Sequence, residues 1–168
     1  MSQWIIRDER LGDEAAIAGV IDAAFSHAPH ASGTESAIVD HLRKAGDLAI
    51  SLVAEGRDGR ILGHVGFSPV SIGETGRGWY GLGPVSVVPP HQRMGIGAAL
   101  IRRGLDHLRS AGAEGCVVLG EPQYYGRFGF RNDPGVEFRG APPEYFQVLA
   151  LAGSVPPRGV VTYAAAFG

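Results

Sequence analysis

The stretch from Val85 to Leu100, VSVVPPHQRMGIGAAL, holds the residues whose types and spacing are best suited to chemistry. Two prolines end an apolar, β-branched run, and Gly95 and Gly97 open a run with helical spacing. Glycines at the start of a helix let successive backbone N–H groups turn toward one point, where the helix dipole also favours an anion. Arg93 lies in the same turn and could add a positive charge. The turn therefore predicts a phosphate-binding site.

Three other interpretations of this glycine turn are possible. A Rossmann dinucleotide site requires a third glycine where Leu100 stands, and an acidic residue at the end of the next strand, which Glu114 precedes. A Walker A loop requires Gly-Lys-Ser/Thr after the glycines, and this sequence does not continue in that way. The remaining alternative is structural, because Gly95 and Gly97 could simply ease the packing of the helix on the sheet.

Length and composition indicate one ordinary globular domain over residues 1–168, with 45% hydrophobic and 19% charged residues. The formal net charge of -2 gives no electrostatic reason to expect a nucleic-acid partner. The single cysteine, Cys116, cannot form an internal disulfide, and the first residues lack the apolar core of a signal peptide. No apolar run reaches the roughly 18 residues that span a bilayer. We therefore expect a cytoplasmic protein that binds neither nucleic acid nor membrane.

Hydrophobic periodicity predicts the elements that must position the turn. Strands are expected over residues 4–8, 48–55, 61–70, 79–88, 116–119, 145–151 and 160–166. Helices are expected over residues 14–25, with Asp13 as the N-cap, and over residues 33–45, 95–109 and 122–128. The Asp58-Gly59 step predicts an antiparallel hairpin, and the strand, helix and strand between residues 79 and 119 predict a right-handed crossover with a parallel pair. The class is therefore α/β or α+β with a mixed sheet.

Three linked motifs resemble the signature of the GNAT superfamily of acetyl-CoA-dependent N-acetyltransferases. QRMGIG, residues 92–97, is similar to the Q/R-x-x-G-x-G/A turn of that family, and VSVVP before it is similar to the preceding apolar strand with its proline. YYGRFGF, residues 124–130, is similar to the family's Y-x-x-x-G-F motif. The element order also resembles that of the superfamily, so the likeness covers nearly the whole chain, most tightly residues 83–130. YYGRFGF and EYFQVLAL further resemble the branch of small bacterial acetyltransferases called YhbS type.

The resemblance implies a GNAT fold: a mixed, mostly antiparallel central sheet flanked by helices, with a strand-helix-strand core that binds acetyl-CoA. The backbone of Val85, Ser86 and Val87 would then pair with the pantetheine arm, and the N–H of Val87 would face the thioester carbonyl. The pyrophosphate would be held by the turn residues Arg93, Met94, Gly95, Ile96, Gly97 and Ala98.

By the same resemblance, Tyr125 falls on the tyrosine that often serves as the general acid. A phenol with an ordinary pKa near 10 remains protonated at pH 7 and can donate a proton. The alternative is that Tyr124, Tyr125 and Phe128 form the core face of a short helix. Val118 departs from the family pattern, because many relatives carry an asparagine there that contacts the pantetheine arm.

The reaction that the resemblance implies is direct transfer of an acetyl group from acetyl-CoA to a primary amine of a small molecule or protein, without a covalent enzyme intermediate. An amine with a pKa of about 10.4 is mostly protonated at pH 7, so a base or a water chain must help. The candidate bases are Glu74, Glu121, His64, His27 and His30. Alternative roles are helix capping for Glu121 and an ordinary solvated position for the histidines.

No metal is expected, because the six histidines lack the spacing of a metal motif. Dimers are common in the superfamily, and the C-terminal third could serve a homodimer interface or close the sheet. The rival function is a GNAT-like module that binds CoA or an acyl-CoA as a sensor without turnover, and a nicotinamide-binding module is a third hypothesis. The sequence does not name the amine acceptor.

Overall fold

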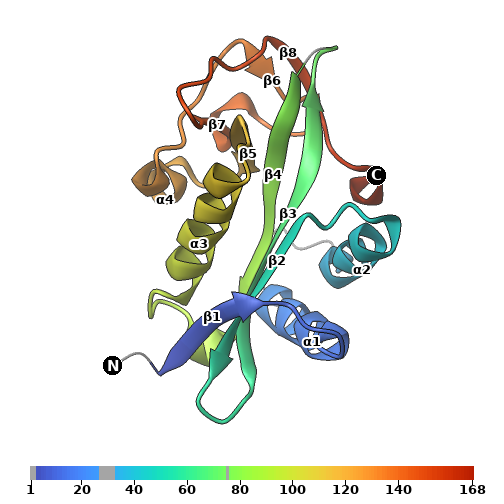
Figure 1. Ribbon diagram of the computed structural model, residues 1–168, viewed down its shortest axis with the longest axis vertical. Coiled ribbons are helices and arrows are strands. Elements are labelled where there is room, and N and C mark those ends of the chain that lie inside the picture. The colour runs from blue at the N-terminus through green and yellow to red at the C-terminus, as the bar shows by residue number, and fades with distance from the viewer. Residues whose placement is uncertain (1–2, 27–32, 75) are drawn as a thin grey trace. The chain divides into compact units, whose positions relative to one another are not determined.

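The computed structural model describes residues 3–26, 33–74 and 76–168 (Figure 1). It has a mixed α/β architecture with an open, mostly antiparallel sheet and flanking helices. The helices and strands, in chain order, are β1 (Trp4–Asp8), α1 (Glu14–Phe25), α2 (Glu35–Ala45), β2 (Ile50–Gly56), β3 (Ile61–Ile72), β4 (Gly76–Val87), α3 (Ile96–Ser110), β5 (Gly115–Leu119), α4 (Pro122–Tyr125), β6 (Val136–Glu137), β7 (Phe146–Ala150) and β8 (Gly159–Thr162).

The chain forms two compact units, and β3, β4 and α3 each contribute to both of them. The first unit comprises Met1–Phe67 and Pro84–Leu105. The second unit comprises Ser68–Gly83 and Asp106–Gly168. The glycine turn of the sequence analysis lies in the first unit, and the predicted acid Tyr125 lies in the second.

In the first unit, β1, β2 and β3 form an antiparallel ladder and β4 lies beside β3. Val53 of β2 pairs with His64 of β3 and packs into a core with Ile17, Ile21 and Val39 of the helices α1 and α2. Helix α3 covers the opposite face (Figure 1). Alternate residues of a strand face opposite sides, so the side chain of His64 points toward α1 and α2.

Two glycines let α3 lie close to β3. A Cβ added at Gly63 would lie 3.0 Å from the side chain of Ile96 and 3.1 Å from that of Leu100. A Cβ added at Gly104 would collide with the ring of Phe67. Helix α3 is therefore in close contact with β3: an added methyl group would collide with Phe67 at Gly104 and would require Ile96 and Leu100 to shift at Gly63.

In the second unit, β4 pairs in parallel with β5 from Trp79 to Leu82, and β5 pairs antiparallel with β7. The strand β8 pairs antiparallel with the end of β3 and in parallel with β6. The core of this unit consists of residues from these strands, namely Val70, Ile72, Trp79, Val117, Val136, Phe146, Val148 and Val161. These residues are mostly β-branched and aromatic, types that favour strands.

Most predicted elements are confirmed, including the antiparallel hairpin of β2 and β3 and the parallel pair of β4 and β5. The strand β6 was not predicted from the sequence, and the last strand ends at Thr162, before the 3-10 turn Ala165–Phe167. Asp13 is the N-cap of α1, but its carboxylate accepts hydrogen bonds from Arg7 and from the N–H of Arg10 rather than from the helix. Within the described residues, none of the helices has the length and apolar character to span a membrane.

Candidate functional site

The end of β4 presents an open backbone edge. Val88 donates its N–H to the carbonyl oxygen of Leu62 on β3 at 2.9 Å. Because bonding direction alternates along an antiparallel pair, Ser86 also directs its backbone toward β3, whereas Val85 and Val87 direct theirs away from it. In the described part of the chain, the pairing of β4 with β5 does not continue past Leu82. The edge at Val85 and Val87 can therefore pair with an extended ligand.

The turn after β4 exposes a series of backbone donors. No N–H from Arg93 to Ala98 donates a backbone hydrogen bond within the described residues, and the first to do so is that of Ala99, to Gly95 at 3.0 Å. Arg93 and Gly95 have φ angles of 64° and 87°. Left-handed residues within such a turn direct neighbouring N–H groups to one side, which creates an anion-binding concavity. The predicted turn residues thus form a site suited to a diphosphate.

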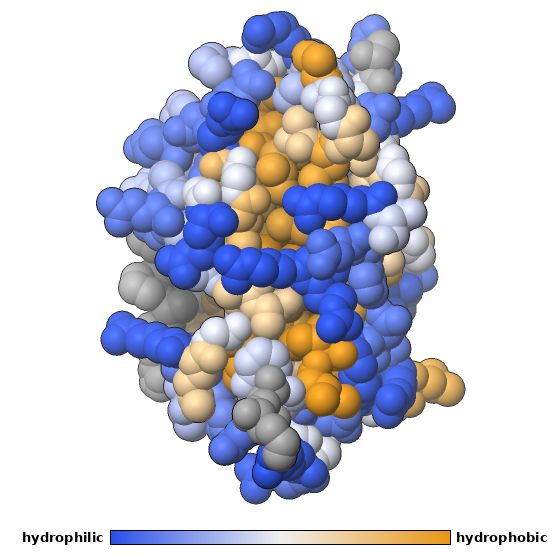
Figure 2. Space-filling model, turned by 60° about the vertical axis from the view of Figure 1, so that its left-hand side comes forward, coloured by the Kyte–Doolittle hydropathy of each residue, from blue (hydrophilic) through white to orange (hydrophobic). Residues whose placement is uncertain are grey.

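The side chains around this turn stabilise its shape and leave it accessible. Gln92 donates from Nε2 to the carbonyl oxygen of Val87 at 2.9 Å, which ties the turn to the end of β4. Arg93 is exposed, and Met94 is 59% exposed. Figure 2 shows that hydrophobic residues also reach the surface on one face of the molecule, among hydrophilic ones. An exposed cation and free amides at the same turn both favour an anion.

Tyr125 is the buried tyrosine of the second unit. It is 9% exposed, and its ring packs edge-to-face against Phe130 and Tyr124, with centroids 6.0 and 5.0 Å away. Burial raises the pKa of Tyr125, so the phenol is protonated at neutral pH and can act only as a proton donor. Tyr124 is half-buried instead, with the guanidinium of Arg127 4.4 Å from its ring centroid. A Cβ added at Gly120 would collide with the ring of Tyr125.

The predicted bases that the structure describes differ in burial. Glu74 is exposed in the turn between β3 and β4. Glu121 is also exposed, and it occupies the N-cap position of α4 that the alternative role requires, without a side-chain hydrogen bond to the helix. His27 and His30 lie outside the described residues. Among the candidate bases that the structure describes, only His64 is buried, with 0% of its surface exposed.

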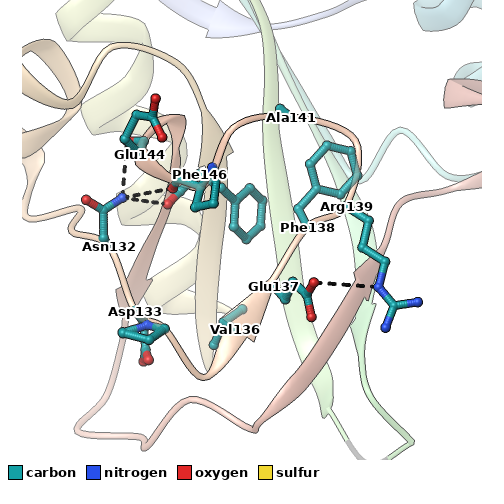
Figure 3. Close-up of a pocket in the computed structure, with 11 residues that line it drawn as sticks. Asn132, Asp133, Val136, Glu137, Phe138, Arg139, Ala141, Glu144 and Phe146 are labelled. Atoms are coloured by element: carbon teal, nitrogen blue, oxygen red, sulfur yellow. Dashed lines mark hydrogen bonds and ion pairs between the residues drawn. The ribbon is translucent and has the colours of Figure 1, made fainter.

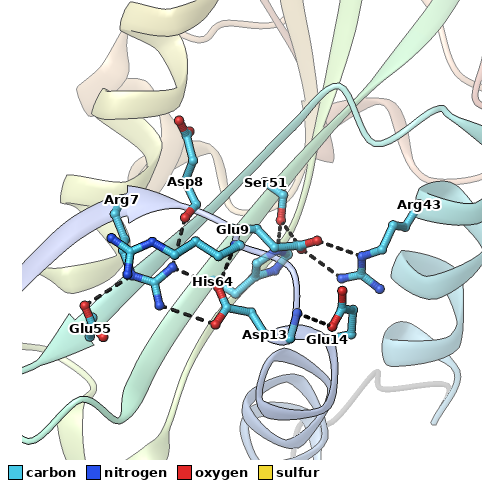
Figure 4. Close-up of polar contacts among 11 residues, drawn as sticks. Arg7, Asp8, Glu9, Asp13, Glu14, Arg43, Ser51, Glu55 and His64 are labelled. Carbon is cyan, nitrogen blue, oxygen red and sulfur yellow. Dashed lines mark hydrogen bonds and ion pairs between the residues drawn. The ribbon is translucent and has the colours of Figure 1, made fainter.

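His64 ends a chain of hydrogen bonds in the first unit (Figure 4). Its Nε2 lies 2.8 Å from the hydroxyl of Ser51, which in turn donates to Oε1 of Glu9 at 2.7 Å. Arg43 of α2 donates to both carboxylate oxygens of Glu9, each at 2.8 Å. The Nδ1 atom of His64 is buried and has no hydrogen-bond partner among the residues that the structure describes. The sequence offered His64 as a candidate base but did not indicate Glu9, Arg43 or Ser51.

Burial governs the charge states in this chain. Desolvation lowers the pKa of His64 to about 4, against the attraction of Glu9, so the ring is neutral at pH 7. Burial alone would raise the pKa of Glu9, but hydrogen bonds from Arg43 and Ser51 outweigh it and hold that pKa below its ordinary value. The hydrogen-bonded chain of side chains therefore contains a neutral imidazole at His64, a carboxylate at Glu9 and a guanidinium at Arg43.

The second unit contains an open pocket of about 750 Å³ that the sequence did not predict (Figure 3). Phe138 and Phe146 contribute apolar surface, and Asn132 donates to the carbonyl oxygen of Phe146 at 2.9 Å. The charged residues of its lining are Asp133, Glu137, Arg139 and Glu144. Three carboxylates and one guanidinium make this pocket unsuited to an anion.

Val118 of β5, which stands where many relatives carry an asparagine, is buried in the second unit. Its apolar side chain cannot make the hydrogen bond that an asparagine would make.

No group of three or more histidine, cysteine or acidic side chains that could hold a metal ion occurs among the residues described here. Cys116 is buried, and burial raises the pKa of its thiol, so this cysteine is an inert part of the core.

Comparison with known proteins identifies the class to which this fold and turn belong. Residues 18–130 match the Acetyltransferase (GNAT) family, and the chain belongs to that family. The expected superfamily and fold class are thereby confirmed.

Individual relatives agree with this assignment. The chain is 37% identical over 99 residues to the uncharacterized N-acetyltransferase YhbS of Escherichia coli K12, and this match spans 59% of each chain. It is 34% identical over 135 residues to the uncharacterized N-acetyltransferase YjhQ of the same strain, spanning 79% of this chain and 71% of YjhQ.

Two solved structures resemble the whole fold. A GNAT family acetyltransferase from Brucella melitensis, in complex with acetyl-CoA, is 52% identical, with a TM-score of 0.87 and 98% of each chain covered. The structure of YhbS from Escherichia coli in complex with CoA is 31% identical, with a TM-score of 0.90, covering 99% of this chain and 93% of YhbS.

Proposed function

We propose that the chain transfers the acetyl group of acetyl-CoA to a primary amine of a small molecule or protein, by direct attack of the amine on the thioester. The observation that carries this proposal is the turn from Arg93 to Ala98, whose N–H groups donate no backbone hydrogen bond in the described part of the chain. The complexes of the Brucella relative with acetyl-CoA and of YhbS with CoA support it.

The first unit supplies the cosubstrate contacts in this proposal. The amides from Arg93 to Ala98 bind the diphosphate, and each interaction of an anion with a helix start contributes about 0.3–1 kcal/mol, with additional charge-assisted hydrogen bonds. Val85 and Val87 pair with the pantetheine arm through the edge that faces away from β3. The N–H of Val87 donates to the thioester oxygen and stabilises its negative charge in the transition state. The backbone of Ser86 contributes little, because it faces β3.

Proton transfer completes the reaction. The amine loses a proton before or during its attack, and the departing thiolate of CoA gains one. We assign the second role to Tyr125, because burial keeps its phenol protonated at neutral pH. The chemistry requires positioning and proton transfer, and none of these steps depends on a metal. A cytoplasmic location and a homodimer stay predictions of the sequence.

Two measurements test the proposal. Calorimetry should detect acetyl-CoA binding, and S-acetylpantetheine, which lacks the diphosphate and nucleotide, should bind at least about 100-fold more weakly if the turn holds the diphosphate. Release of the CoA thiol should then accelerate with at least one member of a panel of amines, polyamines, amino sugars and peptides. Binding without thiol release for any amine would favour the sensor hypothesis, and binding of NADH in preference to acetyl-CoA would favour the nicotinamide module.

A further inference from the structure

Several buried polar atoms have no hydrogen-bond partner within the described residues, and two of them belong to neighbouring strands of the first unit. They are Nδ1 of His64 and the hydroxyl of Ser86. His64 is 0% exposed and Ser86 is 2% exposed. A buried polar atom without a partner costs stability, and such atoms are rare unless a ligand or an internal water completes them. These two atoms therefore need an explanation.

The two side chains lie on the same side of neighbouring strands. The hydrogen bond from Val88 to Leu62 sets the register of β4 against β3 and thereby places Ser86 opposite His64. Directly opposed residues share a face, with Cβ atoms about 5 Å apart. That face is the one covered by α1 and α2, because His64 also pairs with Val53 of their core. The nitrogen and the hydroxyl are thus close enough to bind one small group together.

The chain behind His64 determines which of its ring nitrogens carries the proton. A carboxylate only accepts hydrogen bonds, so the hydroxyl of Ser51 must donate to Glu9. Ser51 can then only accept from His64, so Nε2 carries the ring proton. The remaining nitrogen, Nδ1, is left with an unshared electron pair. Arg43 holds the carboxylate of Glu9 in place with its two hydrogen bonds.

We propose that Nδ1 of His64 and the hydroxyl of Ser86 form a subsite for the nitrogen of the acceptor amine, which donates an N–H hydrogen bond to Nδ1. Ser51, Glu9 and Arg43 act as positioning residues, because they fix the tautomer that leaves Nδ1 able to accept. This inference rests on the proposed acetyl transfer and names the group that would orient the nucleophile in it.

The surroundings favour a neutral amine over an ammonium ion. Desolvation lowers the pKa of His64, although Glu9 opposes this effect, and the same desolvation would act on an amine bound beside it. The charged groups that act on the ring are Glu9, which follows β1, and Arg43 of α2. These two groups are paired with each other, so they leave no free carboxylate to hold an ammonium ion. An amine bound in its neutral form retains the electron pair with which it attacks the thioester.

The first experiment examines His64 and its hydrogen-bond partners in the protein without substrates, and it does not depend on enzymatic activity. Nitrogen NMR of histidine-labelled protein at pH 7 should show His64 as the neutral tautomer protonated at Nε2. A crystal structure of the protein without amine, at about 1.5 Å, should place a water within hydrogen-bond distance of both Nδ1 and the Ser86 hydroxyl. Detection of the Nδ1-protonated tautomer, or apolar atoms filling the space beside Nδ1, would overturn the subsite.

The second experiment measures steady-state rates with the best amine of the panel. Ser86→Ala and His64→Gln should each raise KM for the amine by about tenfold, the value of one hydrogen bond to a buried group, while the Kd of acetyl-CoA stays unchanged. The variant His64→Gln keeps an N–H donor for Ser51 but has no electron pair at the position of Nδ1. An unchanged KM in both variants would overturn the proposal.

Ser51 provides a matched pair that separates positioning from folding. Ser51→Ala removes the hydroxyl that fixes the tautomer, and it should raise KM and shift the NMR signal of His64 toward a mixture of tautomers. Ser51→Thr retains the hydroxyl and should restore both properties. A raised KM in Ser51→Ala with an unchanged tautomer would contradict the positioning role.

The failure of this inference differs from that of the proposed function. If acetyl-CoA binds but no amine is acetylated, the proposed function fails, and the tautomer and water measurements still decide whether the subsite exists. If amines are acetylated and those measurements fail, only the subsite is wrong.

Discussion

The glycine turn and the His64 chain are two polar regions of the first unit, and they are built in opposite ways. The turn uses backbone N–H groups that donate no backbone hydrogen bond among the described residues, and its first residues, Arg93 to Gly95, are exposed. The His64 chain uses one buried side chain, that of His64, and the half-buried side chains of Ser51, Glu9 and Arg43, each paired with the next. Exposed amides can bind a large anion without a protein partner being displaced. Buried, paired side chains instead control where a single proton lies.

This contrast has an energetic consequence. Amides of the turn are solvated before a ligand arrives, so each bond to a phosphate replaces a bond to water and contributes little by itself. A buried imidazole has no hydrogen bond to bulk water, so placing a proton and a charge on it carries the full cost of desolvation. We therefore expect the turn to respond gradually to substitution, and the His64 chain to respond strongly to pH.

The largest expected effect is the response of stability to acid. The unfolded chain protonates His64 near its ordinary pKa of 6.5, whereas the folded chain protonates it only near 4. Stability is therefore fully present above pH 6.5 and falls as the pH is lowered toward 4, by about 3 kcal/mol in total. Urea unfolding at several pH values measures this loss.

The control for the acid response is His64→Gln, whose stability should be nearly independent of pH between 6.5 and 4.5. Glu9 and Asp13 have lowered pKa values in the folded state, so their own contributions are lost mainly below this window. Parallel loss of stability in both proteins within the window would contradict the assignment to His64.

The buried phenol of Tyr125, in the second unit, can be compared with these two regions of the first unit. Tyr125→Phe should lower kcat by about 100-fold if the phenol is the general acid, and it should leave the Kd of acetyl-CoA unchanged. The matched control is Tyr163→Phe, because burial raises the pKa of that phenol in the same unit as well. Equal rates for the wild type and Tyr125→Phe would remove the acid role.

A substitution in the turn tests the exposed half of the comparison. Gly95 has a φ of 87°, and no atom lies within 4 Å of an added Cβ, so Gly95→Ala strains the backbone without a steric clash. We expect a loss of about 1 kcal/mol in stability and a roughly tenfold weaker binding of acetyl-CoA, measured by calorimetry. Gly112→Ala, at a φ of 77° with equally open space, should lose similar stability and no affinity.

The smallest effect is expected at Arg93, one of two non-glycine residues with positive φ in the described chain. Arg93→Gly should relieve strain, and it should weaken acetyl-CoA binding by about two- to fivefold at low salt, because one cation near the diphosphate is lost. Ala152→Gly, the same relief at a φ of 53°, should leave affinity unchanged. If Arg93→Gly binds acetyl-CoA as tightly as the wild type at low salt, the guanidinium has no part in the site.

The sequence predicted the backbone of the site better than its side chains, and the reason is physical. Glycine and proline restrict or release φ locally, so QRMGIG after two prolines indicates the turn without knowledge of the rest of the fold. The pairing of Glu9 with Arg43 joins residues that lie 34 positions apart, and no local signal connects them. The residue type of His64 makes it a candidate base, but its burial, and the lack of a partner for its Nδ1 among the described residues, depend on the helices packed over β3.

Short elements escaped prediction for a similar reason. The strand β6 has two residues, Val136 and Glu137, and depends on pairing with β8 rather than on its own pattern. The pocket lined by residues 132–146 arises from that pairing and from a loop rich in proline and glycine. Hydrophobic periodicity needs a longer run to be informative.

The close packing of α3 on β3 at Gly63 and Gly104 has a consequence for ligand binding. Because an added methyl group would collide with Phe67 at Gly104 and would crowd Ile96 and Leu100 at Gly63, α3 already packs closely on β3, and the packed side chains resist its withdrawal. The donors at the helix start are consequently held in one arrangement before any cosubstrate arrives. An incoming diphosphate would then lose its own freedom of motion, while the protein would have almost none left to lose.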